Sequence, residues 1–266
     1  MGRKGHGRYG KHSRRDRRKK KGGIISTVIL IVAICVFAFS AFQLYKIFNG
    51  YHKGESEYND LVKLAVTEDK GEQENGTDDQ DGSRFSVDFD ALRQINPDVV
   101  AWIRFDEPAV INYPVVQGSD NSEYLSKTFK GYDNTVGTIF VNAYNHADFN
   151  DRNTIIYGHY MYNGTMFNEL EQYHEKSFWE KYPSFYIYTP DGKTRTYTVF
   201  SAAVVKDTAD QYNLTYATDE AFESYLKMCK EDSAYDTGTE VNAQSQIVSL
   251  STCTNVREDE RFLLQG

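Results

Sequence analysis

A buried β-strand that carries a thiol to its end is predicted by one stretch, Ile247-Val248-Ser249-Leu250-Ser251-Thr252-Cys253-Thr254-Asn255. Its first residues are β-branched or apolar and alternate with small polar residues, a pattern typical of strands inside a sheet. Cys253 at the end of such a strand is a candidate nucleophile. The alternative is a structural role, because free cysteine is among the most buried residue types.

The composition supports a folded core and separates the two ends of the chain by charge. Of the 266 residues, 40% are hydrophobic and 14% aromatic, which suits one or two domains and excludes a chain that is disordered throughout. Residues 1–21 contain eleven Lys or Arg and one acidic residue, whereas the rest of the chain contains 19 basic and 37 acidic residues. The two parts carry net charges of +10 and −18, which indicates that they face different surroundings.

A membrane anchor is predicted near the N-terminus. Residues 24–44 form an uncharged run of 21 residues, and a spanning helix needs about 20. The sequence that follows, Gln43-Leu44-Tyr45-Lys46, lacks the small residues of a signal-peptide cleavage site, so we expect an uncleaved anchor over residues 23–48. The excess of cationic residues before the span predicts a basic cytoplasmic tail over residues 1–22, with the rest of the chain outside the membrane. A nucleic-acid-binding arm is the less favoured alternative for the tail.

A stalk and a flexible linker are predicted for residues 49–83. Residues 58–66 have helical spacing and could extend the anchor as a short stalk helix, and residues 68–83 are rich in acidic residues, Gly and Asn, as solvated linkers are. The remaining residues, 84–266, have a length that suits a single domain.

Short strands dominate the pattern of residues 84–266. A short helix over residues 88–95 is stopped by Asn96-Pro97, and further helices are expected over residues 166–173 and 219–231. Asp191-Gly192 between two strand-like runs predicts a hairpin. The expected strands cover residues 99–105, 109–116, 137–142, 154–157, 184–189, 195–205 and 246–251. This pattern predicts a mainly β barrel or sandwich with helices packed on it.

Two of the three cysteines lie outside the predicted anchor, which raises the alternative of a disulfide between Cys229 and Cys253. Cys229 falls on the apolar face of the helix predicted over residues 219–231, whereas Cys253 ends a strand beside hydroxylic residues. This difference in setting favours two free thiols over a disulfide.

A nucleophilic thiol needs a base, and His159 is the favoured candidate. It stands at the end of an apolar strand, directly after Gly158, as Cys253 stands at the end of its own strand. His146, in a polar loop, is the competing candidate. Arg261, eight residues after the cysteine, offers a fork of donors suited to an oxyanion, although a surface ion pair with one of the acidic residues 258–260 is the alternative. The candidate ligands show no metal-site spacing, so no metal is predicted.

These residues together resemble a known family. Leu250-Ser251-Thr252-Cys253 with Arg261, and Tyr157-Gly158-His159 upstream, look like the motifs of sortases, the cysteine transpeptidases of Gram-positive surfaces. Asn96-Pro97-Asp98-Val99-Val100-Ala101-Trp102-Ile103 and Tyr113-Pro114-Val115-Val116-Gln117-Gly118 are similar to segments of class B members. The resemblance extends over about residues 84–264.

The resemblance implies an eight-stranded sortase β-barrel with an N-terminal helix, and a helix in the loop before the cysteine strand. It implies that Cys253 attacks the Thr carbonyl of a C-terminal sorting signal on a secreted protein and forms a thioester. His159 would protonate the departing amine and then deprotonate an amine of a cell-wall peptide, either a peptidoglycan precursor or a cross-bridge, while Arg261 holds the oxyanion. The residues implied to line the signal groove are Asn121, Leu125, Tyr212 and Ser251.

The resemblance implies no cofactor, and the expected partners include no nucleic acid. The expected location is the cell membrane, with a single span and an extracellular catalytic domain. The chain ends a few residues earlier than the resemblance implies for the closing strand that begins near Arg261. Either this strand is short, which would leave a weak edge, or the sequence is a fragment.

Two other classes stay open. An extracytoplasmic cysteine peptidase would use the same three groups and pass the acyl group to water. A membrane-anchored binding module would use Cys253 only as a structural residue.

Overall fold

The computed structural model describes residues 1–2, 16–70, 83–254 and 256–266, and it divides into two compact units, Met1–Asn49 and Gly50–Gly266. Most of the predicted basic tail, residues 3–15, and most of the predicted linker, residues 71–82, lie outside the described residues. Helix α1 (Asp16–Ala65) carries the apolar run. By length and composition alone, its part from Gly23 to Ala65 could cross a membrane once.

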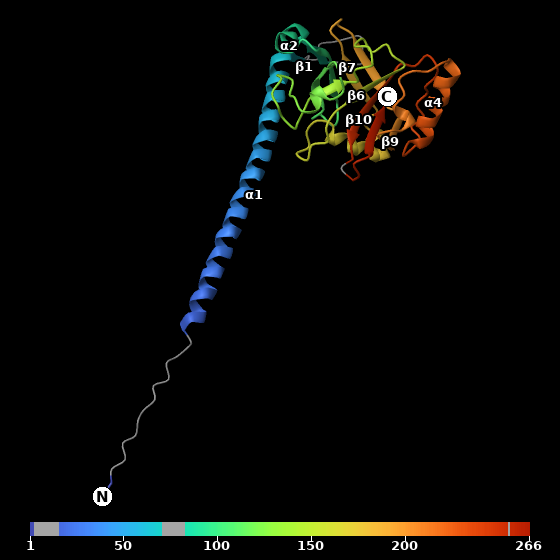
Figure 1. Ribbon diagram of the computed structural model, residues 1–266. Helices are drawn as coiled ribbons and strands as arrows, with labels where there is room; N and C mark the ends of the chain where they lie inside the picture. Colours follow the sequence, from blue (N-terminus) through green and yellow to red (C-terminus); the bar gives the residue numbers. More distant parts are fainter. Residues whose placement is uncertain (3–15, 71–82, 255) are drawn as a thin grey trace. The chain divides into compact units, whose positions relative to one another are not determined.

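The second unit is built on one mixed sheet of nine strands, in the order β8-β7-β3-β4-β5-β6-β10-β11-β9. The strands are β3 (Val99–Phe105), β4 (Asn112–Val116), β5 (Ile139–Val141), β6 (Asn153–Tyr157), β7 (Ser184–Tyr188), β8 (Thr194–Thr198), β9 (Ser201–Lys206), β10 (Ile247–Cys253) and β11 (Glu260–Gln265). Strand β10 lies beside β6 in parallel and beside β11 in antiparallel orientation, near the middle of the unit (Figure 1). All residues of β10 except Cys253 are buried, as its apolar and small polar composition predicts.

A single run of chain joins the two edges of the curled sheet. Residues 195–205 were expected as one strand, but the run is divided at Val199-Phe200 into β8 and β9. Strand β8 pairs with β7 at one end of the sheet order, and β9 pairs with β11 at the other end. At the break, Val199 N donates to Pro183 O and Phe200 N to Gln265 O, so the backbone changes partner from one edge to the other. The predicted mainly β fold with helices packed on it is confirmed, and the sheet has nine strands instead of eight because one predicted strand is split in two.

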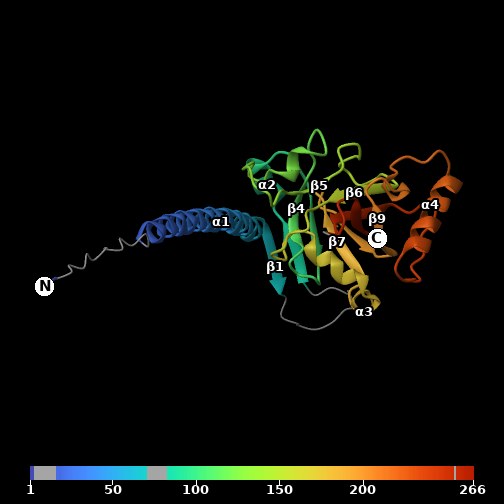
Figure 2. The same ribbon diagram turned by 60° about the horizontal axis from the view of Figure 1, so that its bottom comes forward.

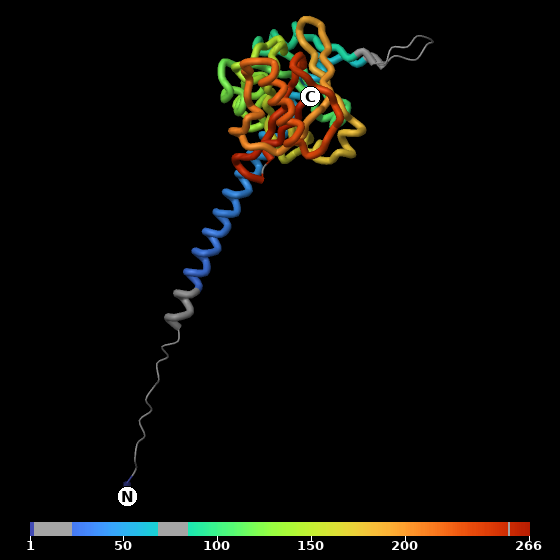
Figure 3. Tube along the Cα trace, turned by 90° about the vertical axis from the view of Figure 1, so that its right-hand side faces the viewer, coloured from blue at the N-terminus to red at the C-terminus, as the bar shows by residue number. Residues whose placement is uncertain are grey.

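Strand β11 is not the weak edge that the sequence suggested. It pairs with β10 on one side and with β9 on the other, and its residues from Phe262 onward are buried. Figure 3 shows the C-terminal strand inside the unit and not at its border.

Helices α2 and α4 are each capped by a side chain at the N-terminus. Helix α2 (Phe89–Ile95) begins where the Asp88 side chain accepts a hydrogen bond from Ala91 N, and it ends at Asn96 before the proline. Helix α4 (Asp219–Asp232) is capped by Thr218 and buries the predicted face, which includes Cys229. The two helices lie on opposite sides of the unit (Figure 2).

The helix expected over residues 166–173 begins two residues later, at Asn168, and is the 3₁₀ helix η2 (Asn168–His174). The short helix α3 (Lys176–Trp179) follows it. Two further 3₁₀ turns, η1 (Glu123–Leu125) and η3 (Asp210–Tyr212), flank the cavity described below. Strands β1 (Val66–Lys70) and β2 (Ser83–Val87) pair with each other on either side of residues 71–82.

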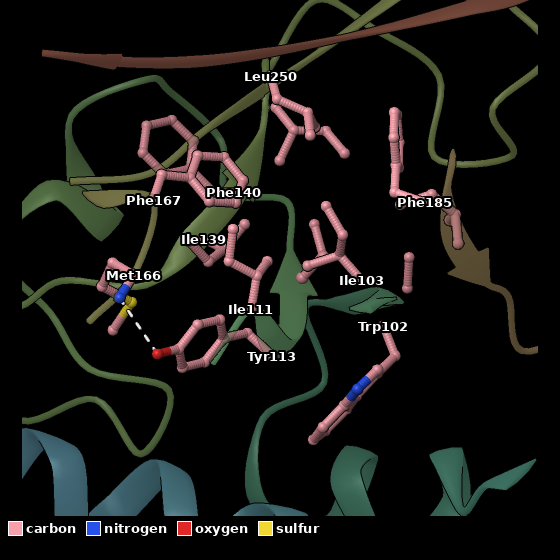
Figure 4. Close-up of a cluster of buried hydrophobic side chains, with 14 of the residues drawn as sticks. Trp102, Ile103, Ile111, Tyr113, Ile139, Phe140, Met166, Phe167, Phe185 and Leu250 are labelled. Atoms are coloured by element: carbon pink, nitrogen blue, oxygen red, sulfur yellow. Dashed lines mark hydrogen bonds between the residues drawn. The ribbon is translucent and has the colours of Figure 1, made fainter. Parts of the chain in front are cut away.

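The core is apolar and rich in aromatic side chains. Leu250 from β10, Ile103 from β3 and Phe140 from β5 point toward one another inside the curled sheet (Figure 4). Close to them, Tyr113 OH accepts a hydrogen bond from Met166 N at 3.1 Å, which satisfies the phenolic oxygen of a side chain that is only 5% exposed.

The end of α1 belongs to this core. The sequence suggested a stalk here, yet the compact unit begins at Gly50, and Tyr58, Leu61 and Ala65 are buried in the same cluster as the barrel residues. Helical spacing in residues 58–66 therefore marks a face that packs on the barrel.

Two leucines of this helix provide a test. Leu61 is 1% exposed and Leu64 is 52% exposed. We expect Leu61→Ala to lower the free energy of unfolding by about 2–5 kcal/mol, because it removes buried methyl groups and leaves a cavity. The same substitution at Leu64 should change it by roughly 0.5 kcal/mol or less. Chemical denaturation of the full chain in detergent measures both values, and equal effects would contradict the packing of residues 50–65 on the barrel.

Candidate active site

The thiol and the guanidinium face each other across one hairpin. Strands β10 and β11 pair with Cys253 directly opposite Arg261, and the residues between these two form the turn of the hairpin. Side chains of directly opposed residues lie on the same face of a sheet. Both side chains are partly buried.

The imidazole reaches the same edge through the parallel pairing of β6 and β10. The last pair of this ladder is Ser251 with Tyr157, and Gly158 N donates to Ser251 O at 3.1 Å. Cys253 and His159 each follow two residues after that pair. Because parallel strands run in the same direction, their carboxyl ends meet at one edge of the sheet, and the two side chains are brought together there.

The His159 ring is oriented by a backbone carbonyl. Its Nε2 lies 2.6 Å from Leu125 O, and since a carbonyl oxygen only accepts, Nε2 carries the hydrogen. Gly137 lies against the same ring with φ of +63°, and a Cβ on it would come within 2.9 Å of His159 Cδ2 and 3.0 Å of Leu125 O. A side chain at residue 137 would therefore displace the imidazole or the carbonyl that holds it.

Arg261 is held mainly by its own connection. Its Nη1 donates to the backbone carbonyls of Glu258 at 2.7 Å and Glu260 at 2.8 Å. Its Nη2 lies 3.5 Å from Asp207 Oδ2. The ion pair that the sequence suggested with the acidic residues 258–260 is thus replaced by contacts to two of their carbonyls.

Asp207 is a member of the site that the sequence analysis missed. It follows β9 directly, and β9 pairs with β11 so that Val205 lies opposite Arg261. The available signal was an acidic residue at the end of the predicted strand over residues 195–205, but the partner strand could be identified only from the fold.

One cavity contains all seven residues that the sequence singled out. Its volume is about 620 Å³. It is lined by the proposed catalytic residues His159, Cys253 and Arg261, by the proposed groove residues Asn121, Leu125, Tyr212 and Ser251, and also by Phe140, Asn142, Tyr144, Tyr157, Gly158, Asp207, Leu214 and Thr252.

The polar groove residues are fixed by hydrogen bonds. Asn121 Oδ1 accepts from Ala143 N at 2.8 Å, which leaves the amide group of Asn121 as the donor end of the side chain. Tyr212 OH and Ser251 Oγ are 2.7 Å apart. Burial raises the pKa of Tyr212 to about 12, so the phenol stays neutral at physiological pH.

His146, the competing candidate for the base, does not line this cavity. His146 Nδ1 lies 2.7 Å from Asp151 Oδ1, an exposed pair in which the carboxylate raises the pKa of His146. All three cysteines are free, so the disulfide alternative is wrong. Within the described residues, no group of three His, Cys, Asp or Glu side chains could hold a metal ion.

Comparison with known proteins agrees with this fold. Residues 106–266 match the sortase domain family. The chain is 30% identical to sortase B of Listeria monocytogenes over 246 residues, which cover 90% of this chain and 94% of that protein. It is 35% identical to sortase B of Staphylococcus aureus over 166 residues, or 62% of this chain and 67% of that protein.

Solved structures give the same result. A crystal structure of sortase B from Bacillus anthracis superposes with a TM-score of 0.70 at 31% identity and covers 82% of this chain and 97% of that one. A substrate complex of Staphylococcus aureus sortase B superposes with a TM-score of 0.63 at 30% identity, over 66% of this chain and 82% of that one. The chain therefore belongs to the sortase family of cysteine transpeptidases, which act in cell-wall anchoring. Within this family it is a class B sortase.

The two cysteines of the second unit should differ sharply toward iodoacetamide. Burial raises the pKa of the Cys229 thiol to about 11, so at pH 8 only ~0.1% of it is thiolate, the nucleophilic form. Cys253 is partly exposed in the cavity. We expect the native full chain to be labelled at Cys253 first, and at Cys229 only after unfolding or as the pH approaches 11. Peptide mapping by mass spectrometry measures this, and comparable labelling of both at pH 8 would contradict the burial of Cys229.

Proposed function

We propose that the protein cleaves a C-terminal sorting signal of secreted proteins after Thr and joins the protein to an amine of a cell-wall peptide. The observation that carries the proposal is the parallel register of β6 and β10, in which Cys253 and His159 each follow the last pair by two residues, with Arg261 opposite Cys253 and all three residues lining one cavity. Thiol, imidazole and guanidinium can supply the nucleophile, the acid–base group and the oxyanion donor of an acyl transfer through a thioester.

The first half-reaction forms the thioester. Cys253 Sγ, as the thiolate, attacks the Thr carbonyl carbon, and the carbonyl oxygen becomes an oxyanion. When the C–N bond breaks, His159 gives a proton to the departing amine. Because Nε2 of His159 is bound to Leu125 O, Nδ1 is the nitrogen available for proton exchange.

The second half-reaction transfers the acyl group. The amine of the cell-wall peptide attacks the thioester carbonyl, His159 takes its proton, and the C–S bond breaks to return the thiolate. A water molecule in place of the amine would give hydrolysis by the same groups, so the acceptor decides between transpeptidase and peptidase.

Arg261 would stabilise the oxyanion in both halves. Among the described residues its hydrogen bonds use Nη1 alone, and Nη2 lies 3.5 Å from Asp207 Oδ2, so Nε is the nitrogen left for a substrate oxygen. A guanidinium is charged at any pH at which the protein is folded, and donors that are already oriented need little reorganisation during the reaction.

The four groove residues Asn121, Leu125, Tyr212 and Ser251 would bind the sorting signal. Their common cavity supports this assignment, and so does the fact that the similar Staphylococcus aureus enzyme has been solved as a substrate complex. The donor amide of Asn121 and the hydroxyl pair of Tyr212 and Ser251 suit a signal with polar side chains.

The membrane topology is also a proposal. Residues 23–48 would span the membrane once, with residues 1–22 in the cytoplasm and the catalytic domain outside. Eleven Lys or Arg in residues 1–21 support this direction.

Intact mass spectrometry tests the reaction. The full chain in detergent is incubated with a Gln-Thr-containing sorting peptide, with and without a cell-wall-type amine. We expect an acyl adduct on Cys253 that passes to the amine. An adduct that only hydrolyses in the presence of the amine would favour the peptidase, and the absence of any adduct would overturn the proposal.

Cys253→Ala should abolish turnover with the fold intact. His159→Ala should lower kcat by about 10²–10⁴-fold, because the proton donor to the leaving amine is lost. His146→Ala is the matched control and should leave turnover unchanged. A cleavage assay on the peptide measures all three, and normal turnover by His159→Ala would rule out its role as acid and base.

Arg261→Lys should lower kcat by about 10²–10³-fold, since an ammonium cannot reproduce the fork of donors. Arg257→Lys on the same connection is the control, because Arg257 is exposed and its only described ion pair is with Glu260 at 3.7 Å. Similar rates for the two variants would contradict the role of Arg261.

A further inference from the structure

One face of the last turns of α1 binds the segment of residues 122–138, here called the His-supporting segment. Gly50 O accepts a hydrogen bond from Asn134 Nδ2 at 3.0 Å. Glu57, which is 9% exposed, accepts one from Lys130 N at 2.8 Å through its carboxylate. The positions that contact the His-supporting segment are Gly50, Gly54, Glu57 and Tyr58, a spacing that places them on one side of a helix.

Helix α1 packs close to the His-supporting segment because residue 54 is a glycine. A Cβ at this position would lie 2.9 Å from Val136 Cγ2, so only glycine allows the helix to pack this near. A glycine inside a helix costs about 1 kcal/mol relative to alanine. The packing against Val136 accounts for a residue that lowers the intrinsic stability of the helix.

Tyr58 makes the contact nearest to the catalytic site. Its hydroxyl donates to Gly137 O at 2.5 Å and lies 3.1 Å from Thr138 Oγ1. The side chain is 4% exposed, and its ring meets Tyr113 edge to face with centroids 5.4 Å apart. Burial raises the pKa of Tyr58, so the hydroxyl is a constant donor at any pH at which the protein acts.

Gly137 separates Tyr58 from the imidazole. The Tyr58 hydroxyl binds the carbonyl of Gly137, and the Cα of Gly137 faces His159. A Cβ on Gly137 would come within 2.9 Å of His159 Cδ2. The next residue, Thr138, donates its N–H to Tyr124 O at 2.9 Å, beside the Leu125 carbonyl that orients His159. Both supports of the ring, Gly137 and Leu125 O, therefore lie in the segment to which α1 is bound.

We propose that Tyr58 is a positioning residue for the reaction: through Gly137 it fixes the backbone that holds His159 in its working orientation. This inference rests on the role proposed for His159. It also assigns a function to residues 50–65 of α1, which form a part of the catalytic apparatus and not only a connection to the anchor.

The test compares two tyrosines with the same chemistry. Tyr58→Phe removes one buried hydroxyl that donates to a backbone carbonyl. Tyr173→Phe does the same, because Tyr173 OH donates to Tyr182 O at 2.7 Å and its side chain is 0% exposed, but Tyr182 lies outside the His-supporting segment. Both variants should lose a similar amount of folding stability. A difference in kcat between them would therefore come from where the removed hydroxyl lies.

Two measurements on the full chain in detergent are made for each variant. Kinetics with the sorting peptide should show kcat lowered about tenfold by Tyr58→Phe with KM nearly unchanged, and no such change for Tyr173→Phe. Spectra of ¹⁵N-histidine-labelled protein, assigned with His159→Ala, should show the Nε2 signal of His159 shifted in Tyr58→Phe alone.

Equal kcat in Tyr58→Phe and wild type, or an unshifted His159 signal, would overturn the inference. Equal losses in both variants would do the same, because they would reflect general stability. If wild type formed no Cys253 adduct, the proposed function itself would fall, whatever the spectra showed.

Gly54→Ala provides a second variant should Tyr58→Phe not fold. It favours the helix itself but forces it away from Val136. A lowered kcat with a shifted His159 signal is expected, and unchanged values of both would count against the inference.

Discussion

The parallel pairing of β6 with β10 is the constraint on which the site depends. Cys253 and His159 are 94 positions apart in the sequence, and they meet only because each follows the Ser251–Tyr157 pair by two residues. Slipping this register by one residue would turn every side chain of β10 to the other face of the sheet and move the thiol away from the cavity. The chain must also cross over between these strands, since parallel neighbours cannot be joined by a tight turn.

A buried polar network holds that register. Asn153 on β6 accepts from Ser249 Oγ on β10 at 2.8 Å, and Gln265 on β11 donates to the same hydroxyl at 3.0 Å. Tyr225 on α4 receives hydrogen bonds from both amides, at 3.0 and 3.1 Å. In any other register these buried groups would lose their partners at a cost of about 1–3 kcal/mol each. Hydrogen bonds from three strands, β6, β10 and β11, and from helix α4 thus favour a single register of β6 with β10.

Local sequence signals were enough for much of this arrangement and insufficient for the rest. The approximate positions of most strands, the helices α2 and α4, and the places of Cys253 and His159 at strand ends follow from residue type and spacing. Asp207 and the buried face of residues 50–65 do not, because their partners are distant in sequence: Tyr58 bonds to Gly137, and Asp207 meets Arg261 through the pairing of β9 with β11. The division of β8 from β9 was missed for the same reason, since a change of pairing partner leaves no local pattern.

The way Arg261 is held explains how it can be both fixed and still useful as a charge. A bidentate ion pair would orient the guanidinium but neutralise it. Here two backbone carbonyls, of Glu258 and Glu260, bind Nη1 and set the orientation, while the nearest carboxylate, of Asp207, stands 3.5 Å from Nη2 with 42% of its side chain exposed. Solvent screens a carboxylate at that exposure, so it cancels little of the field of the cation. The positive charge therefore remains available beside Cys253, its partner across the strands, and an acyl transfer would develop negative charge next to that thiol.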